Sequence, residues 1–291
     1  MPRRLRVTGA AWLILVASVA SAATEAPLRV IVTVLPQVEV ATRVGGELVE
    51  VVTLVPPGAF PDTFELTPKQ MTMLADADLW LRVGIPFESI LVERIASLAP
   101  SLEVVDGCSG IDREPMDGDD HPGHGHGALD PHIWLDPSLV AHHAAILADA
   151  LCRAYPAGCG TFEANLAGYR ADLTAADERV AATLAGHRGA PLFVFHPAYG
   201  YFARRYGLVQ VPVEVSGKVP TGRRLASLVD LARNADARAL FVQPQFAGGG
   251  ADAAAAAMGV SVVELDPLAP DLVANLERMA DTIARSLGNR P

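Results

Sequence analysis

Short apolar runs alternate with stretches of helical periodicity along most of the chain. Runs rich in Val, Ile, Leu and Phe predict β-strands over 28–34, 49–55, 78–83, 192–195, 208–213, 239–242 and 260–265. The stretches between them predict helices over 38–44, 67–75, 86–98, 138–154, 223–234 and 271–287. Because strands that alternate with helices indicate parallel sheets, the pattern predicts an α/β protein.

One long helical stripe separates the two halves of this pattern. Its apolar side chains recur at steps of three and four residues, at Phe162, Leu166, Tyr169, Leu173, Ala176, Val180 and Leu184. A helix over 161–187 would be about 40 Å long at about 1.5 Å per residue. We therefore predict two lobes, over 23–160 and 188–291, each with a mostly parallel sheet flanked by helices. One long rigid helix bridges them.

The N-terminus has the pattern of a secretory signal peptide over 1–22. Three arginines precede an apolar run and a small-residue cleavage site, and no later apolar run is long enough to span a membrane. No cysteine stands at the cleavage site, which argues against a lipid anchor. Cleavage would remove three positive charges, so the net charge of −10 would become −13. The sequence predicts a soluble periplasmic protein that does not bind nucleic acid.

The chain has three cysteines, and an oxidising compartment permits a disulfide. Cys152 and Cys159 flank an expected helix end and turn, so they are the predicted pair. Cys108 is then left over. We interpret it as a partly buried thiol rather than a metal ligand, because a single cysteine has no ligand spacing of its own.

A segment over 107–129 has no apolar period and is dominated by Gly, Pro, Asp and His. We expect a mobile loop there, because connections of this length are uncommon unless they are functional or disordered. Directly after it, His132 stands between Pro131 and a second proline at Pro137. Prolines restrict the backbone around them, which favours a rigidly held imidazole suited to binding a metal.

Four side chains with metal-binding chemistry follow predicted strands or the long loop. Asp62 and His132 belong to the first half of the chain, and His196 and Asp266 to the second. Open α/β sheets bind ligands at the carboxyl ends of their strands. We therefore expect a metal between the lobes that ties the two halves together.

Several ordered motifs resemble one family, the metal-specific (cluster A-I) solute-binding proteins that deliver zinc or manganese to ABC importers. The resemblance covers nearly the whole chain after residue 22 and is carried by segments 57–68, 130–137, 196–202, 243–246 and 265–268. It implies two α/β lobes joined by a long helix, and a membrane permease as partner. It also implies that His132, His196 and Asp266 are metal ligands.

One position departs from the family pattern, because Asp62 stands where the family usually has histidine. Carboxylates favour Mn²⁺ or Fe²⁺, whereas imidazoles favour Zn²⁺. The loop histidines His121, His124 and His126 favour Zn²⁺ instead, since such tracts are typical of the zinc members of the family. They could form an auxiliary metal site. Our interpretation favours Zn²⁺, with Mn²⁺ or Fe²⁺ as the alternative.

Each candidate ligand also has an ordinary structural interpretation. Asp62 could cap a helix or close a turn, and Asp266 could begin an Asp-Pro turn. His132 and His196 could be hydrogen-bonded core histidines. Gln243 lies near the expected site and could orient a ligand without binding the metal.

Taken together, the sequence predicts a monomeric periplasmic receptor that carries a metal ion to an ABC permease. No reaction is implied, because no separate nucleophile or general base accompanies the ligand set. A secreted zinc metallohydrolase is the alternative from another class, with Glu65 as its one nearby base. Receptors for siderophores or vitamins would share the architecture, but their organic ligands do not need this His/Asp set.

Overall fold

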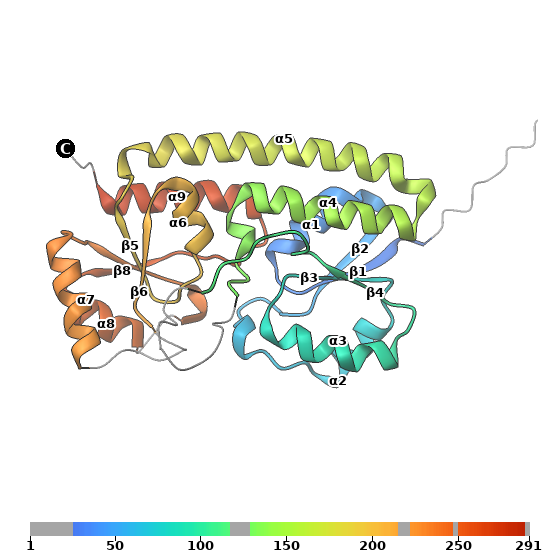
Figure 1. Ribbon diagram of the computed structural model, residues 1–291, viewed down its shortest axis with the longest axis horizontal. Helices are drawn as coiled ribbons and strands as arrows, with labels where there is room; N and C mark the ends of the chain where they lie inside the picture. The colour runs from blue at the N-terminus through green and yellow to red at the C-terminus, as the bar shows by residue number, and fades with distance from the viewer. Residues whose placement is uncertain (1–25, 117–128, 215–221, 247–249, 289–291) are drawn as a thin grey trace, which may run out of the picture.

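Two four-stranded parallel sheets lie side by side in the computed structural model, which describes residues 26–116, 129–214, 222–246 and 250–288 (Figure 1). The first sheet has the order β2-β1-β3-β4 and the second the order β6-β5-β7-β8. Every pair within them is parallel, as the alternation of elements predicted. The strands are β1 (Leu28–Val32), β2 (Val49–Thr53), β3 (Leu79–Arg82), β4 (Glu103–Asp106), β5 (Pro191–Val194), β6 (Val209–Pro212), β7 (Ala239–Val242) and β8 (Ser261–Glu264).

Helices cover both faces of the two sheets. They are α1 (Pro36–Gly45), α2 (Pro68–Ala75), α3 (Pro86–Leu98), α4 (Pro137–Ala154), α5 (Cys159–Leu184), α6 (Gly200–Tyr206), α7 (Arg223–Asn234), α8 (Gly250–Met258) and α9 (Leu272–Leu287). In Figure 1, α5 runs above both lobes, with α1, α4, α6 and α9 between it and the sheets. Helices α2 and α3 lie below the first sheet, and α7 and α8 below the second.

Proline sets the start of the first four helices, because its fixed φ suits the first helical turn and its missing N–H costs nothing there. Thr67 and Gln70 add a reciprocal capping box at α2. The N-terminal cap of α2 is therefore Thr67. Asp62, for which helix capping was one alternative, makes no capping hydrogen bond in its own short 3-10 turn, Pro61–Thr63.

The core follows from strands that are apolar on both faces, as buried parallel strands are. In β1, Val30 and Val32 face the large cluster beneath α5. Ile31 faces the opposite side of the sheet, where it packs in a separate cluster with side chains of α2 and α3. The cluster beneath α5 contains side chains from both sheets and from α1, α4, α5 and α9, so one continuous core joins the lobes. The predicted two-lobe α/β fold with one long bridging helix is confirmed.

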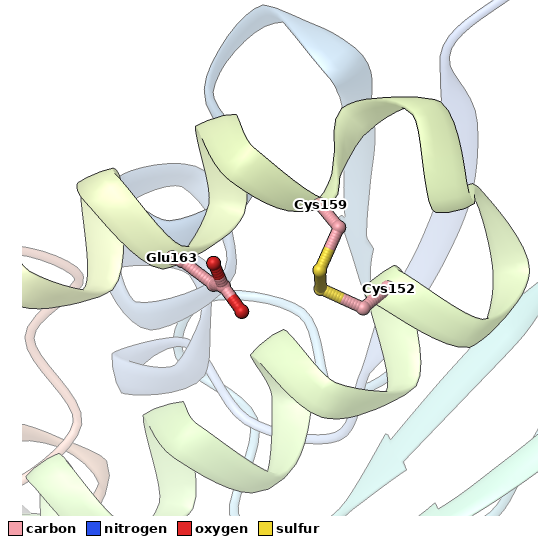
Figure 2. Close-up of side chains that lie close together, drawn as sticks. All are labelled: Cys152, Cys159 and Glu163. Carbon is pink, nitrogen blue, oxygen red and sulfur yellow. A yellow bond between two sulfur atoms is a disulfide. The ribbon is translucent and has the colours of Figure 1, made fainter.

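The bridging helix α5 buries six of the seven side chains of the predicted stripe, and Leu166 is half-buried. At its start, the predicted disulfide joins Cys152 near the end of α4 to Cys159 at the beginning of α5 (Figure 2). Within the described residues, no helix is long and apolar enough to cross a membrane. The predicted signal peptide over 1–22 lies outside the described residues.

Three elements escaped the sequence pattern. Strand β4 has only two apolar residues between two acidic ones, so it gives no strand signal. Helix α6 has seven residues, too few to display a helical period. Helix α8 is mostly alanine, which favours a helix but lacks the apolar-polar contrast on which the prediction relies.

Candidate metal centre

The four predicted ligands lie at the ends of the sheets that face each other. Asp62 is in the turn Pro61–Thr63 after β2, and His132 directly precedes the 3-10 turn Ile133–Leu135. His196 follows β5 by two residues, and Asp266 follows β8 by two residues. All four therefore come from connections at the carboxyl ends of parallel strands, or from the long connection after β4, where open α/β sheets bind ligands.

His132 is held in place by the carboxylate of Asp130, two residues earlier in the chain. Its side chain is 7% exposed, and Asp130 Oδ1 accepts hydrogen bonds from both the backbone N–H, at 2.9 Å, and Nδ1–H, at 2.7 Å. A carboxylate in this role accepts hydrogen bonds, so the proton sits on Nδ1 and the Nε2 lone pair faces away from Asp130. Tyr201 in turn donates to the Asp130 carbonyl at 3.1 Å, which ties this segment to the second lobe.

His196 has the same arrangement with a different partner. Its Nδ1 atom pairs with a carboxylate oxygen of Glu214, and Phe246 and Phe60, which also contact each other, both pack against its ring. The side chain is 4% exposed, and its Nε2 atom is buried without a hydrogen-bond partner in the described structure. A buried nitrogen without a partner is costly unless it has a further role, such as binding a cation.

Asp62 places a carboxylate close to that nitrogen. Its Oδ2 lies 3.6 Å from His196 Nε2, and its side chain is 30% exposed. Two ligands of a tetrahedral zinc ion, each bound at about 2.0–2.2 Å, are separated by roughly 3.3–3.6 Å. The pair is therefore spaced as two atoms that share one metal. The His132 ring completes the group on the first lobe's side, with its centroid 5.5 Å from that of His196.

Asp266 directly precedes two residues that reach this region, and its own side chain is engaged in a turn. Its Oδ1 accepts from the Leu268 N–H at 2.9 Å, so the Asp-Pro turn considered from sequence is present. The next residue, Pro267, accepts from Trp134 Nε1 of the first lobe at 2.7 Å. Pro267 and Leu268 line the same small cavity as Asp62, His132 and Gln243, with a volume of about 10 Å³.

No three of the four predicted ligands have donor atoms all within 4.8 Å of one another in the described residues. Among the described residues, the one group that meets this distance is Cys152, Cys159 and Glu163 (Figure 2). Its two sulfur atoms are joined to each other, which removes the thiolates that would bind a metal. This group is therefore not a candidate metal site, unlike the residues between the lobes.

The other candidates from sequence have varied positions. Cys108 is buried, its thiol donates to the Val83 carbonyl at 3.0 Å, and burial raises its pKa to about 12. Such a thiol is inert, in agreement with the interpretation of a buried structural cysteine. Gln243 is buried beside the cavity, and its Oε1 has no partner in the described structure. The loop histidines His121, His124 and His126 lie outside the described residues.

Sequence reasoning missed the two carboxylates that hold the imidazoles. Asp130 lies in the segment 130–137 that resembles the family, but neither it nor Glu214 has a role in the sequence-based prediction. The signal for Glu214 was present, since it is an acidic residue two positions after β6, at the same end of the sheet as His196 and Asp266. Backbone hydrogen bonds place it there, because the Glu214 N–H donates to the Phe195 carbonyl at 3.0 Å.

A family model described as the periplasmic component A of a zinc-uptake complex matches residues 30–286. The chain belongs to this family. Membership in this zinc-uptake family confirms the resemblance to metal-specific solute-binding proteins, and its description as a periplasmic component indicates an extracytoplasmic location.

Individual relatives in the zinc-uptake family differ in the metal that their names give. The high-affinity zinc uptake protein ZnuA of Paracoccus denitrificans is 30% identical, over 75% of this chain and 77% of its own length. The manganese-binding lipoprotein MntA of Halalkalibacterium halodurans is 28% identical, over 70% of this chain and 67% of its own.

Among solved structures, a zinc-bound deletion mutant of ZnuA covers 91% of this chain and 100% of its own. Its TM-score is 0.84 at 34% identity. The chain spans 51% of the length of the streptococcal zinc-binding protein AdcA, which it also matches.

Proposed function

We propose that this protein captures Zn²⁺ between its two lobes and delivers it to the membrane permease of an ABC importer. The observation that carries the proposal is the pair of buried histidines, one from each lobe, with His196 Nε2 lacking a partner and lying 3.6 Å from Asp62. Asp62, His132, His196 and Asp266 are the proposed ligands, and the zinc-uptake family supports the role.

The choice of zinc rests on the two imidazole nitrogens, because zinc favours them more than manganese does. Two carboxylates in the proposed set pull toward Mn²⁺ or Fe²⁺, and a manganese-binding relative keeps that alternative in view. Zinc is named in the description of the matching family and in that of the zinc-bound ZnuA structure, which is 34% identical, and this favours zinc.

Cargo binding is favoured over catalysis by the size of the cavity. A volume of about 10 Å³ is near the roughly 10–15 Å³ that one water molecule needs. A zinc hydrolase needs an open coordination position beside a substrate cleft, and a siderophore or vitamin receptor needs a larger space. Glu65, the base considered for hydrolysis, is exposed and does not line the cavity.

Export and assembly complete the proposal. Residues 1–22 act as a cleaved signal peptide, and the mature chain works as a monomer in the periplasm. The loop histidines His121, His124 and His126 gather zinc and pass it to the ligands between the lobes.

Metal titration of the apoprotein with a competing chelator tests the function. We expect one tight zinc site in the wild type, and weaker binding of Mn²⁺ in the same assay. Replacing both His132 and His196 with alanine removes one ligand from each lobe. The loss in affinity should exceed the roughly 10- to 100-fold cost of removing a group that only orients a ligand.

His142→Ala is the matched control, because His142 is an exposed histidine whose Nε2 contacts the Ser109 carbonyl away from the site. It should leave zinc affinity unchanged. Undiminished zinc affinity in the double variant would reject the proposed site, and preferential Mn²⁺ binding by the wild type would reject zinc as the cargo.

A further inference from the structure

Glu214 is a buried carboxylate with an unusual set of contacts. Its side chain is 3% exposed, one oxygen accepts from His196 Nδ1, and the other oxygen, Oε2, has no hydrogen-bond partner in the described structure. Burying a carboxylate is expensive, and the cost falls only when hydrogen bonds replace the lost water. The hydrogen bonds of Glu214 therefore offset only a small part of the free energy that burying its carboxylate costs.

Glu88 shows what a structural buried carboxylate looks like in the same molecule. It accepts hydrogen bonds from the Thr33 hydroxyl at 2.5 Å, the Val83 N–H at 3.0 Å and the Gly84 N–H at 2.6 Å. Both of its oxygens are used, and they fix the junction between β3 and α3. Within the described part of the chain, Glu214 has instead one side-chain partner, and that partner is the imidazole of a proposed metal ligand.

The aromatic neighbours of His196 cannot set its orientation alone. Phe246 stacks on the ring at an interplanar angle of 27°, and Phe60 meets it edge-on at 89°. These contacts restrain the plane of the ring but distinguish poorly between its nitrogen and carbon atoms. A half-turn about the Cβ–Cγ bond would keep the plane and carry Nε2 away from Asp62. The hydrogen bond to Glu214 selects one of the two orientations.

We propose that Glu214 is a positioning residue for the metal cargo, which holds His196 as the Nδ1–H tautomer with its Nε2 lone pair directed toward Asp62. This inference rests on the proposed function, since His196 is a ligand only there. Metal-binding histidines commonly donate their second ring N–H to a carboxylate, which fixes the tautomer and strengthens the metal bond. Asp130 holds His132 in the same way, so each lobe supplies one imidazole already oriented for binding.

The test combines the tautomer of the apoprotein with zinc affinity. Long-range ¹H–¹⁵N spectra of apoprotein should show His196 protonated on Nδ1 in the wild type. In Glu214→Ala the Nε2–H tautomer should become populated, and zinc affinity should fall roughly 10- to 100-fold. Glu214→Gln keeps a carbonyl oxygen as acceptor, so it should retain the Nδ1–H tautomer and lose less affinity than the alanine variant.

Glu88→Gln is the matched control, because it alters a buried carboxylate of the other lobe that does not touch the site. It should leave the His196 tautomer and zinc affinity unchanged. Wild-type apoprotein with His196 protonated on Nε2 overturns the inference, as does full zinc affinity in folded Glu214→Ala. Absence of zinc binding by the wild type would defeat the proposed function instead, and the spectra would still decide whether Glu214 orients His196. If Glu214→Ala fails to fold, the wild-type and Glu214→Gln spectra decide.

Discussion

Three buried histidines in this molecule show how hydrogen-bond partners divide structural from metal-binding roles. His143 uses both ring nitrogens, because Nδ1–H donates to the Gly107 carbonyl and Nε2 accepts from Gln37. His132 and His196 each use one nitrogen on a carboxylate, which leaves Nε2 for another partner. The same residue type therefore carries different chemistry according to what lies on its second nitrogen.

Part of this division could be predicted from sequence. His132 and His196 are predictable because each stands beside a proline, His132 after the long loop and His196 at the end of a predicted strand. Their partners were harder to find, since Glu214 is 18 residues from His196 and the pairing depends on the register of β5 and β6. The sequence pattern gives strands but not their register, and for that reason the carboxylate was missed.

The pH dependence of stability should carry the signature of His143. Burial lowers its pKa from the usual 6.5 to about 4. As pH falls below 6.5, the unfolded chain therefore binds a proton that the folded chain does not, and stability drops until about pH 4. The loss is roughly 3 kcal/mol over this window, at about 1.4 kcal/mol per pKa unit.

Urea unfolding at pH 7.5 and at pH 4.5 measures this loss in the wild type and in His143→Gln, which cannot titrate. The difference between the two pH values should be smaller in the variant. Comparison of the two proteins is needed because burial raises the pKa of Glu88, which acts in the opposite direction. An identical pH dependence in both proteins would contradict the prediction, because it would show that folding does not change the pKa of His143.

At the scale of elements, the sequence was informative wherever apolar and polar positions contrast. The predictions over 86–98 and 223–234 coincide with α3 and α7. The long stripe became the buried face of α5, whose start lies two residues before the predicted one. Elements without contrast, such as the alanine-rich α8, were missed. The predicted lobe boundaries at 160 and 188 stay predictions.

The disulfide acts on the elements that it joins rather than on the site. It closes a loop with a sequence separation of seven residues where α4 turns into α5. In the chain-entropy model, a closed loop of this length removes conformational entropy from the unfolded chain and so raises the free energy of unfolding by about 2.5 kcal/mol. We expect a variant with both Cys152 and Cys159 replaced by serine to lose stability by up to that amount.

Chemical unfolding of the wild type and of the double serine variant measures the change, and zinc titration of both provides the control. Zinc affinity should be equal, because the disulfide lies at the far end of α4 from His132. Stability that is unaffected by the replacement, or a loss of zinc affinity, would contradict this account.

The whole molecule is built as two sheets under one shared core. Side chains of α1, α4, α5 and α9 form a continuous apolar cluster with residues of both sheets, and Glu39 of α1 accepts from the Val273 N–H of α9 at 3.3 Å. Lobes with a small polar interface move freely, whereas a large apolar interface restrains them. We therefore expect zinc to be gripped by small movements of the loops around the site, with little hinge motion between the lobes.

The central claim is that one zinc ion is bound jointly by side chains from both lobes. Crystals of the zinc-loaded protein, with anomalous diffraction measured at the zinc absorption edge, test it most directly. We expect one strong zinc peak at about 2.0–2.1 Å from Nε2 of both His132 and His196, with carboxylate oxygens of Asp62 and Asp266 at about 2.0–2.2 Å. A zinc peak bound by residues of a single lobe, or away from both histidines, would contradict it.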